Sequence, residues 1–157
     1  MSKIAVFVDV QNIYYTSRDT FGRAFNYRYF WQQLSQQGSI EQAFAYAIDR
    51  GDDKQQKFQQ ALKHIGFEVK LKPFIQRSDG SAKGDWDVGI TIDVLEYAEQ
   101  VDKVVLLSGD GDFDRLLSAV QQRFGVKCDV YGVRALTAKS LIDACNTFVA
   151  IDERYLL

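Results

Sequence analysis

Short runs of apolar residues alternate with amphipathic segments along almost the whole chain. The first run, from Ile4 to Val8, is unbroken, which is typical of a strand buried on both faces of a sheet. Runs of this kind predict strands over residues 3–10, 43–48, 68–74, 103–107, 126–131 and 148–151. Apolar residues spaced three and four apart predict helices over residues 11–18, 29–36, 52 or 53–64, 85–99, 113–123 and 137–144. This alternation predicts an α/β fold with a mainly parallel sheet of five to six strands and helices on both faces.

Two of the predicted helices have a clear apolar face. In the helix over 85–99 the apolar residues that share one face are Val88, Ile92, Leu95 and Ala98. In the helix over 113–123 the residues expected to face inward are Phe113, Leu116, Leu117 and Val120. The chain's only proline, Pro73, stops the third strand, and a polar loop is expected over residues 76–84.

Composition agrees with one globular domain over residues 1–157. The chain is 46% hydrophobic and 25% charged, enough for a sizeable core. It has no apolar stretch near the roughly 20 residues of a membrane span and no signal-peptide pattern at its N-terminus. We therefore expect a soluble, cytoplasmic protein with no membrane partner. Cys128 and Cys145 do not form a C-x-x-C pattern, so both are expected to be reduced core residues.

Charge is unevenly distributed along the chain. The net charge of −2 alone argues against a nucleic-acid-binding protein. However, residues 50–83 hold eight basic and four acidic residues, against 11 basic and 17 acidic elsewhere. The basic segment has two interpretations that the sequence leaves open: contact with phosphates, or an ordinary solvated helix face.

The strongest chemical signal is the string Ser108-Gly109-Asp110-Gly111-Asp112-Phe113-Asp114, which follows the apolar run 104–107. Its three carboxylates repel one another unless a cation lies between them, and oxygen ligands favour Mg²⁺ or Mn²⁺. An EF-hand is excluded because Arg115 and Gln121 stand where glycine and glutamate are needed. A dinucleotide-binding turn is excluded because Asp114 replaces its third glycine. A helix start explains one aspartate of the three.

Other aspartates are expected at the same edge of the sheet. Asp9 ends the first strand and Asp110 follows the fourth, and these strands are natural neighbours at the centre of a doubly wound sheet. Asp112 comes two residues later at a helix start. Asp87 lies in the first turn of another helix, two residues after the alternative candidate Asp85. Residues from both ends of the chain are thus predicted to meet.

Three strings together resemble the signature blocks of the NYN domains, and most closely those of the LabA-like branch. The strings are Phe7-Val8-Asp9-Val10-Gln11-Asn12, Lys83-Gly84-Asp85-Trp86-Asp87-Val88-Gly89-Ile90-Thr91-Ile92-Asp93 and Ser108-Gly109-Asp110-Gly111-Asp112-Phe113. NYN domains belong to the PIN-like nucleases. The resemblance implies a three-layer Rossmann-like (PIN-like) fold and a ribonuclease that hydrolyses RNA phosphodiesters, preferably single-stranded, with carboxylate-bound Mg²⁺ or Mn²⁺.

The resemblance also implies roles for individual residues. Those expected to bind metal and act in catalysis are Asp9, Asp87, Asp110 and Asp112. Residues expected to contact substrate are Asn12 and Ser108, which lie in the matching strings, and Lys83 and Trp86, which are expected there because they lie close to Asp87 in the sequence. Asp93 lies about 9 Å of helix rise beyond Asp87, too far to share its ion, so a structural or supporting role is expected. Asp114 is expected on the helix surface, and His64 is expected to be a helix-terminal residue.

Two other functions share features with this sequence. One is a regulatory module that binds RNA or a protein and does not catalyse a reaction. Such a module could have the same fold, because a fold does not guarantee catalytic turnover. A haloacid-dehalogenase-type phosphatase also begins with an aspartate after the first strand, but it needs a second acid where Gln11 stands. Tyr14 and Tyr15 are expected either to stack on bases or to pack within the protein or a homodimer.

Overall fold

The computed structural model describes residues 1–73, 75–76, 82–83 and 85–157, with side chains described over 1–73 and 85–157. The predicted loop over 76–84 contains two basic residues that are candidates for contact with substrate phosphates, Arg77 and Lys83. Arg77 lies outside the described residues, and Lys83 is described only as backbone. The predicted loop over 76–84 contains two short antiparallel strands, β4 (Ile75–Gln76) and β5 (Ala82–Lys83).

A six-stranded sheet forms the centre of the molecule, and all its strand pairs are parallel. Its strands are β1 (Lys3–Asp9), β2 (Ser39–Asp49), β3 (Glu68–Pro73), β6 (Lys103–Leu107), β7 (Lys127–Gly132) and β8 (Thr147–Ala150). They lie in the order β3-β2-β1-β6-β7-β8, so the strands that carry Asp9 and Asp110 are neighbours, as predicted. The chain winds outward from β1 in both directions, and the point of reversal is where such sheets bind ligands.

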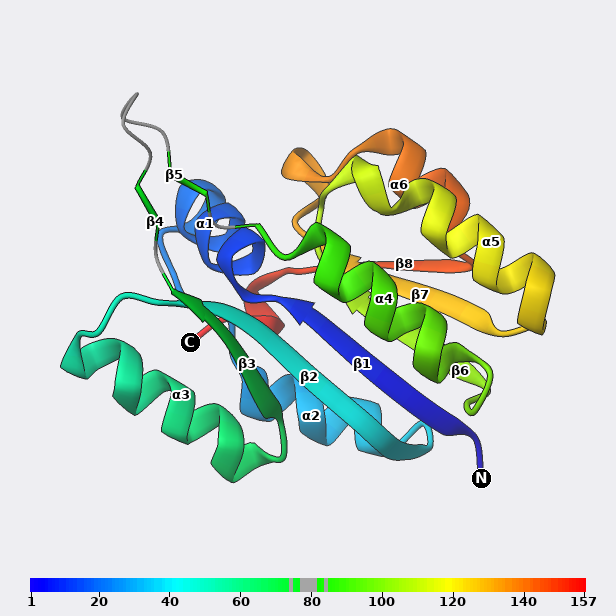
Figure 1. Ribbon diagram of the computed structural model, residues 1–157, viewed down its shortest axis with the longest axis horizontal. Helices are drawn as coiled ribbons and strands as arrows, with labels where there is room; N and C mark the ends of the chain where they lie inside the picture. The colour runs from blue at the N-terminus through cyan, green and yellow to red at the C-terminus, as the bar shows by residue number, and fades with distance from the viewer. Residues whose placement is uncertain (74, 77–81, 84) are drawn as a thin grey trace.

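Helices cover both faces of the sheet, which confirms the predicted three-layer α/β fold (Figure 1). On one face lie α1 (Val10–Phe21), α2 (Tyr27–Ser35) and α3 (Asp53–Ile65). On the other lie α4 (Asp87–Ala98), α5 (Asp114–Phe124) and α6 (Lys139–Ala144). Short 3₁₀ turns are η1 (Gly111–Phe113), η2 (Arg134–Leu136) and η3 (Glu153–Tyr155). Successive β1 residues point to opposite faces, so Val6 and Phe7 belong to separate cores.

The predicted inward face of α4 is wrong. The residues of α4 that pack on the sheet are Ile90, Val94 and Ala98. Of the predicted face only Ala98 is buried, whereas Val88, Ile92 and Leu95 are exposed. The error has a physical reason: α4 is apolar on two opposite sides, and periodicity alone cannot decide which side packs. The prediction for α5 is correct, since Phe113, Leu116, Leu117 and Val120 are all buried.

Other expectations about the core are confirmed. Cys128 is buried and Cys145 is half-buried, and both are free thiols. The aromatic residues divide into two groups, because Phe25, Tyr27 and Phe30 pack together whereas Tyr14 and Tyr15 are exposed. Within the part of the chain that the structure describes, we find no helix that is both long and apolar enough to span a membrane.

Candidate metal centre

Asp9 ends β1 and begins α1 at the carboxyl edge of the sheet. Its Oδ1 accepts the backbone N–H of Asn12 at 3.4 Å and thereby caps the helix. Its Oδ2 accepts the hydroxyl of Ser108, which follows β6, at 3.2 Å. Both oxygens of Asp9 are therefore hydrogen-bonded within the protein, and the second bond ties the end of β1 to the end of β6.

Asn12 and Ser108 fix the backbone that leads to Asp110. The side-chain oxygen of Asn12 accepts the N–H of Gly109 at 2.9 Å, and the Ser108 hydroxyl accepts the N–H of Asp110 at 3.2 Å. Ser108 is fully buried, so its predicted contact with substrate finds no support in this geometry. Gly109 is needed because a Cβ there would lie 2.6 Å from the carbonyl oxygen of Leu136. Asn12 and Ser108 therefore position the site.

Three carboxylates converge beside these residues. Asp110 accepts the N–H of Asp112 at 2.9 Å and so caps the 3₁₀ turn η1, which turns both side chains toward one point. Asp87 is the first residue of α4, which packs against η1. One oxygen from each of Asp87, Asp110 and Asp112 lies within 4.8 Å of the others. Two segments more than 20 residues apart in the chain thus build one acidic group.

The acidic group is electrostatically strained without a cation. Burial, together with repulsion from Asp110, raises the pKa of Asp87 from 3.8 to about 7. Burial also raises the pKa of Asp9 to about 6, although its bonds to Asn12 and Ser108 oppose the shift. Asp9 lies beside the group of three rather than in it, but it is close enough for its charge to contribute to the raised pKa of Asp87. Hard oxygen donors arranged in this way fit a divalent cation such as Mg²⁺ or Mn²⁺.

The start of α4 is held by residues that come before Asp87. The side chain of Asp85 accepts the N–H of Asp87 at 3.3 Å, so the two candidate acids have different roles. The indole N–H of Trp86 donates to the carbonyl of Ala47 at 2.9 Å, and the ammonium of Lys72 lies 4.5 Å from the centroid of the indole ring. Trp86 is half-buried and anchors α4 to β2, while its predicted contact with substrate stays a prediction.

Asp93 has a role separate from the metal centre. It accepts the hydroxyl of Tyr46 at 2.7 Å and forms an ion pair with Lys70 at 2.7 Å. Tyr46 and Lys70 are direct neighbours in the β2–β3 register, so Asp93 joins α4 to two strands at once. This agrees with the structural role expected for Asp93. The contact of Tyr46 and Lys70 with Asp93 could not be predicted from the sequence, because it depends on strand register.

Asp114 and His64 lie outside the group of three carboxylates. Asp114 accepts the N–H of Arg115 at 2.5 Å and lines a groove between α5 and α6. His64 is exposed in the last turn of α3, as predicted. The predicted phosphate contact of Lys83 concerns a side chain outside the described residues and stays a prediction.

Two features indicate the class of protein: a parallel sheet, and carboxylates at the point between β1 and β6 where the strand order reverses. The family model of the NYN domain matches residues 3–152, nearly the whole chain, so the chain belongs to the NYN domain family. It is 28% identical over 160 residues to the low amplitude and bright protein LabA of Synechococcus elongatus, covering 97% of this chain and 85% of LabA. A crystal structure of a protein of unknown function from Vibrio parahaemolyticus is 54% identical, with a TM-score of 0.95, and the match covers 99% of this chain and 96% of that one.

Proposed function

We propose that this protein is a ribonuclease that hydrolyses RNA phosphodiester bonds with a divalent cation held by Asp87, Asp110 and Asp112. The observation that carries the proposal is the convergence of three carboxylate oxygens within 4.8 Å at the carboxyl edge of the sheet. Membership of the NYN family supports RNA as the substrate. The place of action that we propose is the cytoplasm. Residues 1–157 would act as one NYN domain.

The residues around the site fit this chemistry. When bound, a divalent ion lowers the pKa of a coordinated water and polarises a phosphoryl oxygen. Asp87, Asp110 and Asp112 offer only hard oxygen ligands, which suit Mg²⁺ or Mn²⁺. Asp9 adds a fourth negative charge, and its assignment as a fourth ligand stays a prediction. Asn12 and Ser108 hold the ends of β1 and β6 in the arrangement that presents Asp110.

The proposal is tested with the full chain, a labelled single-stranded RNA oligonucleotide and either Mn²⁺ or Mg²⁺. We expect cleavage that stops when EDTA removes the metal. Asp110→Asn should abolish cleavage while the far-ultraviolet circular dichroism stays unchanged. The matched control is Asp114→Asn, which removes a carboxylate four residues away and outside the group, and it should cleave like the original protein.

Two outcomes would contradict the proposal. Cleavage by Asp110→Asn at the original rate would show that this site does not carry out the reaction. Metal-dependent RNA binding without any product would favour the alternative function, a regulatory module that binds RNA and does not turn it over. Titration calorimetry of the same oligonucleotide, with Mn²⁺ present, distinguishes this binding module from a protein that does not recognise RNA.

A further inference from the structure

Helix α4 exposes an apolar ridge on the side opposite the sheet. The ridge consists of Val88, Ile92 and Leu95, which are 70%, 57% and 37% exposed. Their spacing of four and three residues places them in one row along the helix. Single exposed apolar residues are ordinary on protein surfaces. A row of three on a helix that already packs its other side is typical of a surface that another molecule covers.

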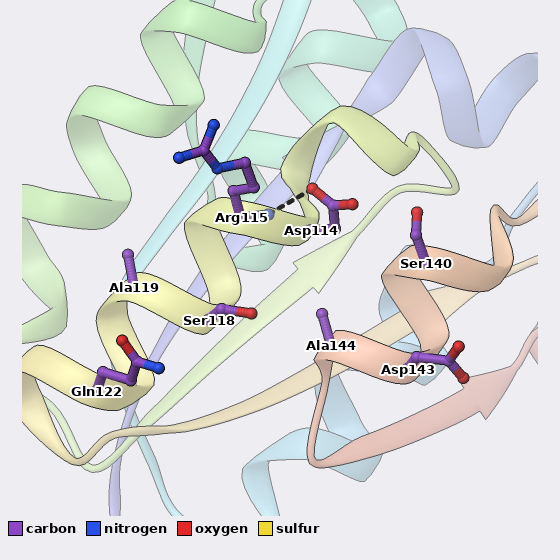
Figure 2. Close-up of a pocket in the computed structure, with 8 residues that line it drawn as sticks. All are labelled: Asp114, Arg115, Ser118, Ala119, Gln122, Ser140, Asp143 and Ala144. Carbon is purple, nitrogen blue, oxygen red and sulfur yellow. Dashed lines mark hydrogen bonds between the residues drawn. The ribbon is translucent and has the colours of Figure 1, made fainter.

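A groove lies on the same face of the molecule, between α5 and α6 (Figure 2). Its volume is about 600 Å³. Small side chains form much of its lining, with Ser118 and Ala119 on α5 and Ser140 and Ala144 on α6. Figure 1 shows α4 beside α5 on this face, so α5 lies between the ridge and the groove. The molecule therefore carries an apolar projection and a shallow depression on one surface.

The exposed charges on the outward sides of α4 and α5 have opposite signs, although the groove lining also includes Asp114 and Asp143, the latter paired with Lys139. The outward side of α4 carries Glu96 and Glu99, whereas the outward side of α5 carries Arg115 and Arg123, all exposed. None of the four side chains takes part in an ion pair with another residue that the structure describes. Figure 2 shows Arg115 extending from α5 on the side away from α6. An acidic and apolar helix thus lies beside a basic one, which is the pattern of a self-complementary surface.

We propose that a second copy of this chain packs on this face, with the α4 ridge of each copy in the α5–α6 groove of the other. A two-fold axis along α5 produces this exchange and closes the assembly as a dimer. Both α4 and α5 run from the carboxyl edge of the sheet to its amino edge (Figure 1). An axis along the helices therefore keeps their C-terminal ends together and brings Glu99 of one copy near the partner's Arg123.

The size of the face indicates a reversible dimer. The helices α4 and α5 have 12 and 11 residues, so each is about 17 Å long, and packed helices lie about 10 Å apart. Such a face is smaller than the roughly 800 Å² per partner that stable interfaces bury. The dimer should accordingly dissociate on dilution.

Sedimentation velocity of the full chain over a range of concentrations tests the proposal. The mass should rise from 17.9 kDa toward twice that value as concentration increases. Ile92→Glu on the ridge and Ser118→Arg in the groove should each weaken the dimer by about tenfold or more. The first places a charge in an apolar contact, and the second fills the groove with a long side chain that excludes the ridge. Both residues are exposed, so the fold should survive, and circular dichroism checks this.

The matched control is Leu71→Glu, which replaces a 40% exposed leucine on β3. Its neighbours Lys70 and Lys72 contact α4 residues, so Leu71 points to the opposite face of the sheet and its variant should still form dimers. A chain that is monomeric at every concentration would overturn the proposal. A dimer that Ile92→Glu or Ser118→Arg leaves intact would also overturn it.

The orientation of the two copies has its own test. Glu99→Arg and Arg123→Glu should each weaken the dimer, and the double variant should recover part of the lost affinity because the pair is restored with its charges exchanged. A double variant that is no better than the weaker single variant would contradict the axis along α5.

Discussion

The metal-free protein should become more stable when the charge of Asp9 is removed, and the gain should grow with pH. Burial raises the pKa of Asp9 from 3.8 to about 6, a shift of about 2 units, and each unit corresponds to 1.36 kcal/mol. A carboxyl group with a raised pKa stabilises the fold when it is protonated. That contribution is complete below pH 3.8 and is lost as pH rises through about 6. At neutral pH the charged Asp9 therefore costs about 3 kcal/mol.

Asp9→Asn removes this titration and keeps an oxygen that can cap α1. Urea unfolding in EDTA at several values between pH 4 and pH 7.5 measures the free energy of unfolding of both proteins. The difference between variant and original should increase by about 2.5 kcal/mol over this range. In thermal melts this corresponds to about 5–10 °C for a chain of this length.

The matched control is Asp19→Asn, which changes an exposed aspartate on the same helix. It measures the effect of removing a carboxylate from this helix at a position that is not buried. If Asp9→Asn and the original protein have parallel stability curves from pH 4 to pH 7.5, the reasoning about a buried, repelled carboxylate at the end of β1 is wrong.

Three further predictions concern the metal, α4 and the turn before Asp110. Mn²⁺ should bind more tightly as pH rises from 6 to 8, because Asp87, with a pKa of about 7, must lose its proton first; calorimetry at four pH values measures this, and a flat affinity would contradict it. Tyr46→Phe should lower the free energy of unfolding by about 1–3 kcal/mol, since its hydroxyl bonds a carboxylate; Tyr15→Phe, at an exposed position, should change it little. Gly109→Ala should destabilise by more than about 1 kcal/mol, because its Cβ would press on the Leu136 carbonyl, and unfolding in urea would show an unchanged stability if this contact can relax.

The adjacency of β1 and β6 could be predicted from the sequence because it depends on local patterns along the chain. Unbroken apolar runs marked β1 and β6, and the alternation of strands with helices implied a parallel sheet that places their carboxyl ends side by side. This was enough to predict that Asp9 and Asp110 lie on neighbouring strands.

The packed face of α4 could not be predicted in the same way. Ile90 and Val94 on one side and Val88 and Ile92 on the other give two apolar rows, and only the sheet decides between them. The partners of Asp93 could not be predicted either, because Tyr46 and Lys70 are 24 residues apart in the chain and become neighbours only through the β2–β3 register. Likewise, the burial of Ser108 follows from the position of its loop, which residue type alone does not reveal.

The most direct test of the central claim is a crystal soaked in Mn²⁺ and measured near the manganese absorption edge. We predict an anomalous peak among the carboxylates of Asp87, Asp110 and Asp112, at the carboxyl edge of the sheet, and its loss in the Asp110→Asn protein. A soaked crystal without a peak at this position, or with a peak that Asp110→Asn does not remove, would contradict the assignment of these aspartates as a metal centre.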